Sequence, residues 1–224
     1  MGEGMKRFLG TLCLLALASC SGTSGGDKAE TGLAADNWVT PGGDIGKSHY
    51  STLTDINRDN VGTLGLAWQA ELGTGRGLEA TPVVIDGVLY TSGVAGRVYA
   101  YDGASGKELW RFEPPVDMQV NRTACCDMVN RGVSVARGKV YVVALDGWMY
   151  ALDQKSGKVV WKADTVVDRK RGDTSTGAPE VAGDVVVIGN AGAEYDVRGA
   201  VSAFDLETGK LAWRFFVVPR DPKL

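Results

Sequence analysis

Short hydrophobic runs recur along the chain, and a few polar or glycine positions separate each run from the next. From residue 81 to residue 113, runs rich in Val, Tyr and Leu alternate with the turn sequences Asp-Gly, Gly-Arg and Ser-Gly-Lys. Runs bounded by such turn residues are typical of strands, and Asp-Gly connections are typical of hairpins. The stretch therefore predicts four strands joined by tight turns.

The same pattern returns twice, at residues 132–161 and 178–213. Three segments align without a gap, and each ends in Gly-Lys, two further residues and Trp: YAYDGASGKELW (99–110), YALDQKSGKVVW (150–161) and SAFDLETGKLAW (202–213). Trp68 stands where an earlier repeat would end. Four-stranded units that recur at a period of about 40 to 50 residues are typical of a β-propeller. We therefore predict an all-β propeller fold.

The repeated Asp-x-x-(Ser/Thr)-Gly-Lys turn is expected to be structural. Its aspartates would accept hydrogen bonds from turn amides, and its glycines would supply positive φ: Asp102, Asp153 and Asp205, with Gly106, Gly157 and Gly209. The tryptophans would pack between neighbouring blades. The turn joins two strands and opens no helix, so it is not a phosphate-binding loop.

The number of repeats is too small for a closed ring. Propellers have at least about four blades, whereas this sequence holds three complete repeats and part of another. An open stack would leave apolar blade faces in water. We therefore expect further blades, from a longer chain or from a partner.

Composition is that of a soluble globular protein. Of the 224 residues 44% are hydrophobic, and the net charge of −3 offers no attraction to nucleic acid. The one basic run, Arg169 to Arg171, lies between Asp168 and Asp173 and is expected to be a solvated loop.

The amino-terminal residues predict export. Lys6 and Arg7 precede an apolar stretch that is too short for an ordinary membrane span. Residues 17–20, Leu-Ala-Ser-Cys, resemble the bacterial lipobox, which implies a lipoprotein signal at 1–19 and lipidation of Cys20. An ordinary signal cut after Ala16 to Ala18 is the alternative. Residues 20–36 have the composition of a flexible linker, and the propeller would occupy 37–224 on the periplasmic side of a membrane, held there through the lipid anchor alone.

Function is expected where the repeats differ. The distinctive segments are GRGLEATP before the first unit, TACCDMVNRG before the second, DTSTGAP before the third and NAGAEYDVRG inside the third. Adjacent cysteines close almost no loop, so a bridge between them would hardly stabilise the fold. An exported protein nevertheless meets an oxidising compartment, in which such a pair can form a disulfide.

The blade signature, ACCDMVNRG and GNAGAEYDVRG together resemble the pyrroloquinoline-quinone (PQQ)-dependent alcohol dehydrogenases of the methanol and ethanol type. The opening at 37–68 is also similar to the start of that family's mature domain. The resemblance implies an eight-bladed propeller with PQQ and a metal, a small alcohol as substrate, and a cytochrome c or similar electron acceptor.

The same resemblance assigns roles to residues of a central pocket. Cys125 and Cys126 would form a vicinal disulfide that lies flat against the quinone, and Arg131 would reach a quinone oxygen and a cofactor carboxylate. The remaining cofactor contacts would come from Glu79, Thr176, Ala191, Gly192 and Ala193. Glu194 would bind the metal, Ca²⁺ or a lanthanide. The family's catalytic aspartate falls beyond residue 224, so no catalytic residue is assigned and this chain alone is expected to be inactive.

Plainer interpretations stay open for each residue. The cysteines could be two buried thiols, Glu79 and Glu194 ordinary loop carboxylates, and Thr176 a hydroxyl that bonds the backbone. Arg131 could merely pair with Asp127. For the whole protein, the alternative is a non-enzymatic propeller lipoprotein that scaffolds outer-membrane assembly, because it would share the blade repeat and the lipobox. Such a scaffold would have no use for the cysteine pair, the following arginine or the Glu194 turn.

Overall fold

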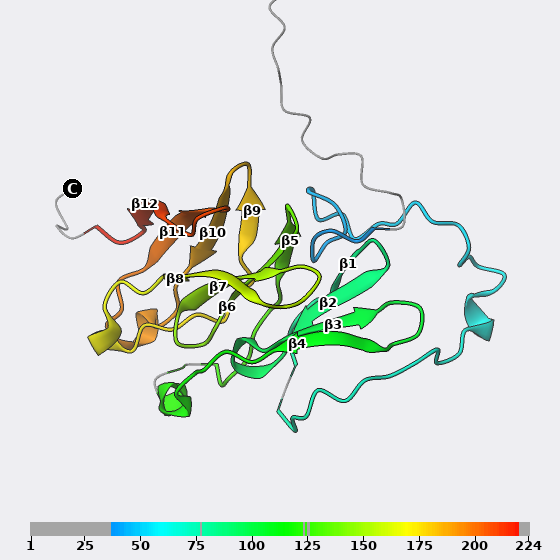
Figure 1. Ribbon diagram of the computed structural model, residues 1–224, viewed down its shortest axis with the longest axis horizontal. Helices are drawn as coiled ribbons and strands as arrows, with labels where there is room; N and C mark the ends of the chain where they lie inside the picture. Colours follow the sequence, from blue (N-terminus) through cyan, green and yellow to red (C-terminus); the bar gives the residue numbers. More distant parts are fainter. Residues whose placement is uncertain (1–36, 77, 123, 125, 220–224) are drawn as a thin grey trace, which may run out of the picture. The chain divides into compact units, whose positions relative to one another are not determined.

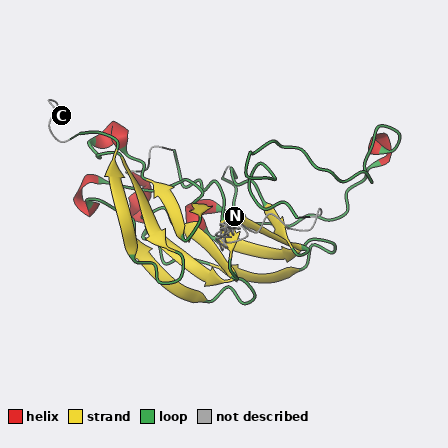
Figure 2. Ribbon diagram, turned by 90° about the horizontal axis from the view of Figure 1, so that it is seen from above, coloured by secondary structure: helices red, strands yellow, loops and turns green. Residues whose placement is uncertain are grey.

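The computed structural model describes residues 37–219 except 77, 123 and 125. All of the described residues belong to one compact unit. Its strands form three separate four-stranded sheets, each a simple antiparallel succession of neighbours (Figures 1 and 2). The predicted signal and linker, with Cys20, lie outside the described residues.

Each sheet corresponds to one sequence repeat and is called a blade below. Blade 1 contains β1 (Val83–Ile85), β2 (Val88–Ser92), β3 (Val98–Asp102) and β4 (Glu108–Phe112). Blade 2 contains β5 (Ser134–Ala136), β6 (Lys139–Val143), β7 (Trp148–Asp153) and β8 (Val159–Asp164). Blade 3 contains β9 (Glu180–Ala182), β10 (Val185–Gly189), β11 (Ala200–Asp205) and β12 (Leu211–Phe216). The prediction of four strands in each repeat is confirmed.

Short 3₁₀ turns lie in the segment before β1 and in the loops between the strands. They are η1 (Val61–Thr63), η2 (Val94–Gly96), η3 (Met118–Arg122), η4 (Arg169–Arg171) and η5 (Ala193–Tyr195). None of the helical turns in the described part of the chain has the length and apolar character that a bilayer crossing requires.

The repeated turn has the same geometry in all three blades. The Oδ1 atom of Asp153 accepts hydrogen bonds from the backbone N–H of Ser156 at 2.8 Å and from its hydroxyl at 2.6 Å. Asp102 and Asp205 make the equivalent bonds with Ser105 and Thr208. These hydrogen bonds stabilise the ionised form and hold the pKa of each aspartate below its ordinary value. The structural interpretation of the turn is confirmed.

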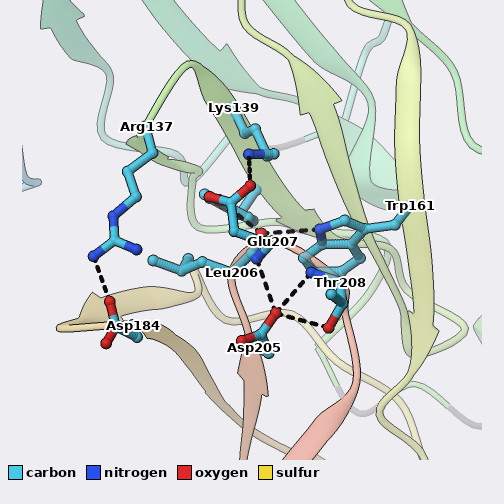
Figure 3. Close-up of polar contacts among 9 residues, drawn as sticks. Arg137, Lys139, Trp161, Asp184, Asp205, Leu206, Glu207 and Thr208 are labelled. Carbon is cyan, nitrogen blue, oxygen red and sulfur yellow. Dashed lines mark hydrogen bonds and ion pairs between the residues drawn. The ribbon is translucent and has the colours of Figure 1, made fainter.

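A tryptophan from the preceding element packs onto each of these turns. The Trp161 Nε1–H donates to the carbonyl of Leu206 at 3.0 Å, as Figure 3 shows. A Cβ atom at Gly209 would lie 2.6 Å from the Trp161 ring, and the φ of Gly209 is 69°. Only glycine suits both the left-handed backbone and the ring contact. Trp68 and Trp110 make the same contacts with the turns that contain Gly106 and Gly157.

Hydrophobic cores lie between consecutive blades. One buried cluster joins blades 1 and 2 and includes Tyr90 and Tyr150, and another joins blades 2 and 3 and includes Tyr141 and Phe204. Two ion pairs also link blades 2 and 3, Lys139 with Glu207 at 2.6 Å and Arg137 with Asp184 at 2.6 Å (Figure 3). Blade 2 is therefore held on both of its faces.

The outer strand of blade 3, β12, is more exposed than the outer strands of blades 1 and 2. Trp213 corresponds in the repeat to Trp110, yet it is 46% exposed whereas Trp110 is 8% exposed. Phe215 on the same strand is 64% exposed. The tryptophans that end blades 1 and 2 pack on the next blade, whereas the tryptophan that ends blade 3 lies in solvent.

Candidate cofactor site

The loops before the first strands of blades 2 and 3 meet at one point. Arg131 precedes β5 and Thr176 precedes β9, and the Arg131 backbone N–H donates to the Thr176 carbonyl at 3.0 Å. This bond joins loops that are far apart in the sequence. It brings the two side chains to the same end of neighbouring blades.

The guanidinium group of Arg131 is held from two sides. Its Nη1 donates to the Thr176 hydroxyl at 2.6 Å, and its Nη2 lies 2.9 Å from the Glu79 Oε2 atom. Thr176 is buried, whereas the side chains of Arg131 and Glu79 are 44% and 43% exposed. Glu79 and Thr176, which precede blades 1 and 3, thus both contact the guanidinium of Arg131, which precedes blade 2.

The simpler pairing of Arg131 with Asp127 is wrong. Asp127 pairs with Arg76 instead. The hydrogen bond from Arg76 holds the pKa of the Asp127 carboxyl below its ordinary value. Arg131 is therefore turned toward Glu79 and Thr176.

An open pocket of about 280 Å³ lies beside this cluster. Its described lining combines Arg131 and Thr176 with the polar Asn190 and with small or apolar residues of blade 3: Gly177, Ala178, Ile188, Gly189 and Ala191. The Ala191 N–H donates to the Thr174 carbonyl at 2.9 Å, which ties the end of β10 to the loop before β9. The structure thus brings together Glu79, Arg131, Thr176 and Ala191.

A glycine turn follows Ala191. Gly192 is buried with a φ of 103°, and a Cβ atom there would lie 2.8 Å from Cγ2 of Val197. Its carbonyl accepts from the Tyr195 N–H at 2.8 Å. Gly192 therefore shapes the backbone between Ala191 and Ala193, where η5 begins.

Glu194 lies in η5 with an exposed side chain, and it is absent from the described pocket lining. No group of three or more His, Cys, Asp or Glu side chains in the described residues is close enough to hold a metal ion. The described residues do not by themselves form a metal site. A ligand role for Glu194 thus stays a prediction.

The cysteine pair is only partly described. Cys126 is exposed in the loop after η3, and Cys125 falls outside the described residues. The predicted vicinal disulfide is therefore outside what the structure describes.

Two asparagines that the sequence prediction did not select support the site. Asn130 is 2% exposed; its Oδ1 accepts from the Ser92 hydroxyl at 2.6 Å, and its Nδ2 donates to the Val143 carbonyl at 2.8 Å. Asn190 closes the loop after β10 through bonds to the backbone of Arg198 and Ala200. Only the position of Asn130 beside Arg131 could have indicated such a role.

The arrangement suits a planar, anionic ligand. A guanidinium fork can donate two parallel hydrogen bonds to a carboxylate. The small and apolar residues of blade 3 that line the pocket could face a flat ring, and the Thr176 hydroxyl could offer a polar contact at the edge of such a ring.

Residues 38–224 match the family described as glucose/ethanol/alcohol dehydrogenase, beta-propeller domain. The chain belongs to this family. The predicted family and the predicted propeller fold are thus confirmed. The match favours a quinoprotein over an outer-membrane assembly scaffold.

Relatives in this dehydrogenase family share about half of their residues with the chain. The quinohemoprotein alcohol dehydrogenase ADH-IIG of Pseudomonas putida is 52% identical over 196 residues, which cover 86% of this chain and 27% of the relative. ADH IIB of the same organism is 50% identical over 226 residues, or 98% of this chain and 33% of that relative. The chain thus spans a third or less of the length of these relatives.

Solved structures of the family agree in fold. The crystal structure of the quinohemoprotein alcohol dehydrogenase from Comamonas testosteroni superimposes with a TM-score of 0.80 at 48% identity, over 84% of this chain and 28% of that one. A europium-containing methanol dehydrogenase gives a TM-score of 0.75 at 38% identity, over 82% of this chain and 32% of that one.

Proposed function

We propose that this chain forms the amino-terminal blades of a periplasmic, PQQ-dependent oxidoreductase that oxidises a primary alcohol or a related alcohol or aldehyde. The observation that carries the proposal is the convergence of Glu79, Arg131 and Thr176 beside the pocket. Family membership and the names of the relatives support it. Cytochrome c is the electron acceptor that we propose, since one relative is named 1-butanol dehydrogenase (cytochrome c).

The residues present fit PQQ, a planar quinone that carries three carboxylates. When bound, the cofactor supplies the two-electron redox chemistry. Arg131 would hold a carboxylate and a quinone oxygen, and Thr176 would orient the guanidinium and contact the cofactor's edge. Ala191 and the turn formed by Gly192 and Ala193 would set the backbone around it.

The roles of the cysteine pair and of Glu194 at this pocket are proposed from the resemblance alone. A disulfide between Cys125 and Cys126 would give a rigid flat surface for the ring. Glu194 would supply one oxygen ligand to Ca²⁺ or a lanthanide, which are hard cations that prefer oxygen, and the remaining ligands would come from outside the described residues. We further propose that the catalytic base lies beyond residue 224 and that Cys20 carries a lipid anchor.

Binding of PQQ tests this proposal. Titration of PQQ into the protein expressed from its whole reading frame should quench tryptophan fluorescence, and Arg131→Gln should weaken the affinity at least about tenfold, because a charge-assisted bidentate contact is lost. Arg137→Gln is the matched control, since Arg137 has the same exposure but lies at the other end of β5. If the Arg131 and Arg137 variants bound PQQ equally well, the site would be assigned wrongly.

A further inference from the structure

We infer that Arg171 is a positioning residue for the turn that carries Glu194: with Asp196 it forms an ion pair, called the latch below, that holds this turn to η4. The inference rests on the proposed function, because the latch affects metal binding only if Glu194 is a metal ligand. The sequence predicts that the basic run Arg169–Arg171 is a solvated loop, yet its two arginines each bind another segment.

Arg169 fixes η4 to blade 2. Its Nε and Nη2 atoms form a bidentate ion pair with Asp164 at 3.0 and 2.7 Å, and its Nη1 donates to the Asp146 carbonyl at 3.0 Å. The Cζ atom also lies 4.8 Å from the centre of the Trp148 ring. A bidentate pair that also stacks on an aromatic ring fixes the plane of the guanidinium. The segment is therefore anchored before the chain reaches Arg171.

Arg171 connects this anchored segment to the η5 turn. Its Nη1 pairs with the Asp196 carboxylate and also donates to the Asp196 carbonyl at 3.3 Å. Within the described part of the chain, no other hydrogen bond or ion pair reaches residues 194–196 from another segment. The Tyr195 N–H bonds only inside the turn, to the Gly192 carbonyl at 2.8 Å. The exposed tip of the turn thus depends on Arg171 for its direction.

Asp196 has a backbone conformation that favours glycine. Its φ of 76° and ψ of 26° are left-handed, and it caps the carboxyl end of η5. Most side chains are strained there, whereas Asp and Asn are tolerated better. Because Arg171 contacts both the carboxylate and the carbonyl of Asp196, it stabilises this conformation. The latch therefore fixes the residue at which η5 ends, two positions after Glu194.

The direction of one effect separates positioning from simple electrostatics. The charge of Arg171 alone would repel a metal ion, so its loss in Arg171→Gln would tighten metal binding. If the latch positions Glu194, Arg171→Gln should instead weaken metal binding about two- to fivefold, the size expected for an exposed ion pair. Lys170→Gln is the matched control, because it removes the same charge from η4 and the Lys170 ammonium makes no ion pair with a described residue.

Terbium luminescence measures this metal affinity. Tb³⁺, a hard cation that prefers oxygen ligands as Ca²⁺ does, is titrated into the PQQ-loaded protein expressed from its whole reading frame. Glu194→Gln gives the effect of losing the ligand itself. Arg171→Lys keeps a cation for Asp196 and should stay within about twofold of the unmodified protein, and Lys170→Gln should not weaken binding. Unchanged or tighter Tb³⁺ binding by Arg171→Gln would overturn the inference.

Hydrogen exchange follows the turn without any metal. The Tyr195 and Val197 N–H groups both donate to the Gly192 carbonyl, at 2.8 and 3.3 Å, so their exchange reports opening of the turn. Arg171→Gln and Asp196→Asn should each speed this exchange about two- to fivefold. Asn tolerates the left-handed backbone, so Asp196→Asn adds no strain. The double variant should exchange no faster than either single one, because each change removes the same pair.

The two measurements fail separately. If Glu194→Gln bound Tb³⁺ as tightly as the unmodified protein, the metal role of Glu194 would fail, and hydrogen exchange would still decide whether Arg171 holds the turn. If the turn exchanged at the same rate in Arg171→Gln and Lys170→Gln, the latch would be wrong whatever the protein binds.

Discussion

At the scale of single residues, buried side chains fix the backbone that presents Arg131. Asn130 satisfies donors and acceptors from β2, from β6 and from Gly132, whose N–H donates to its Oδ1 at 3.2 Å. Removing the amide would leave several buried polar groups without partners. Asn130 therefore fixes the backbone from which the Arg131 side chain extends.

Asn130→Ala should accordingly lower the free energy of unfolding by about 2 to 4 kcal/mol, because buried groups left unsatisfied cost roughly 1 to 3 kcal/mol each. Urea unfolding followed by tryptophan fluorescence measures this. Asn57→Ala, at an exposed position where the amide makes only local turn hydrogen bonds, should cost about 1 kcal/mol or less. Equal midpoints for the two variants would contradict the role of Asn130.

The turn aspartates predict how stability depends on acid. Hydrogen bonds lower their folded-state pKa below the ordinary value of 3.8. Their stabilising contribution is therefore complete above about pH 4 and disappears as the pH falls through the lower folded-state value. Replacing all three with Asn keeps an acceptor oxygen but removes the titration. Urea midpoints below pH 4 should fall less steeply in this triple variant than in the unmodified protein, and identical slopes would refute the assignment.

At the scale of elements, the repeat predicted the blades because strand period, turn chemistry and tryptophan spacing all agreed. The convergence of Glu79 with Arg131 and Thr176 could not be predicted in the same way. It depends on how blades pack side by side, which sequence separation does not reveal, and only the resemblance placed these residues in one pocket. The pairing of Asp127 with Arg76 was missed for the same reason.

The packing of tryptophan on glycine can be separated from backbone strain by two substitutions. Gly209 and Gly138 have φ values of 69° and 72°, but a Cβ atom meets the Trp161 ring at Gly209 and nothing within 4 Å at Gly138. Gly138→Ala should cost about 1 to 2 kcal/mol from left-handed strain. Gly209→Ala should cost a further 1 to 3 kcal/mol or so from overpacking. Equal losses in urea unfolding would show that the tryptophan contact adds nothing.

At the scale of the whole molecule, the residues of the candidate site lie in loops of three successive blades. Blade 2 is covered on both faces, whereas blade 3 exposes Trp213 and Phe215. The relatives are at least about three times as long as the matched part. The opposite wall of the pocket, the remaining metal ligands and the catalytic base are thus proposed to belong to further blades.

The most direct test is a crystal structure of the protein, expressed from its whole reading frame and grown with PQQ and CaCl₂. The account predicts PQQ density beside the first strands of blades 2 and 3, with a carboxylate on the Arg131 guanidinium and the ring edge against Thr176. Density for PQQ elsewhere, or at this pocket without contact to Arg131, would contradict it.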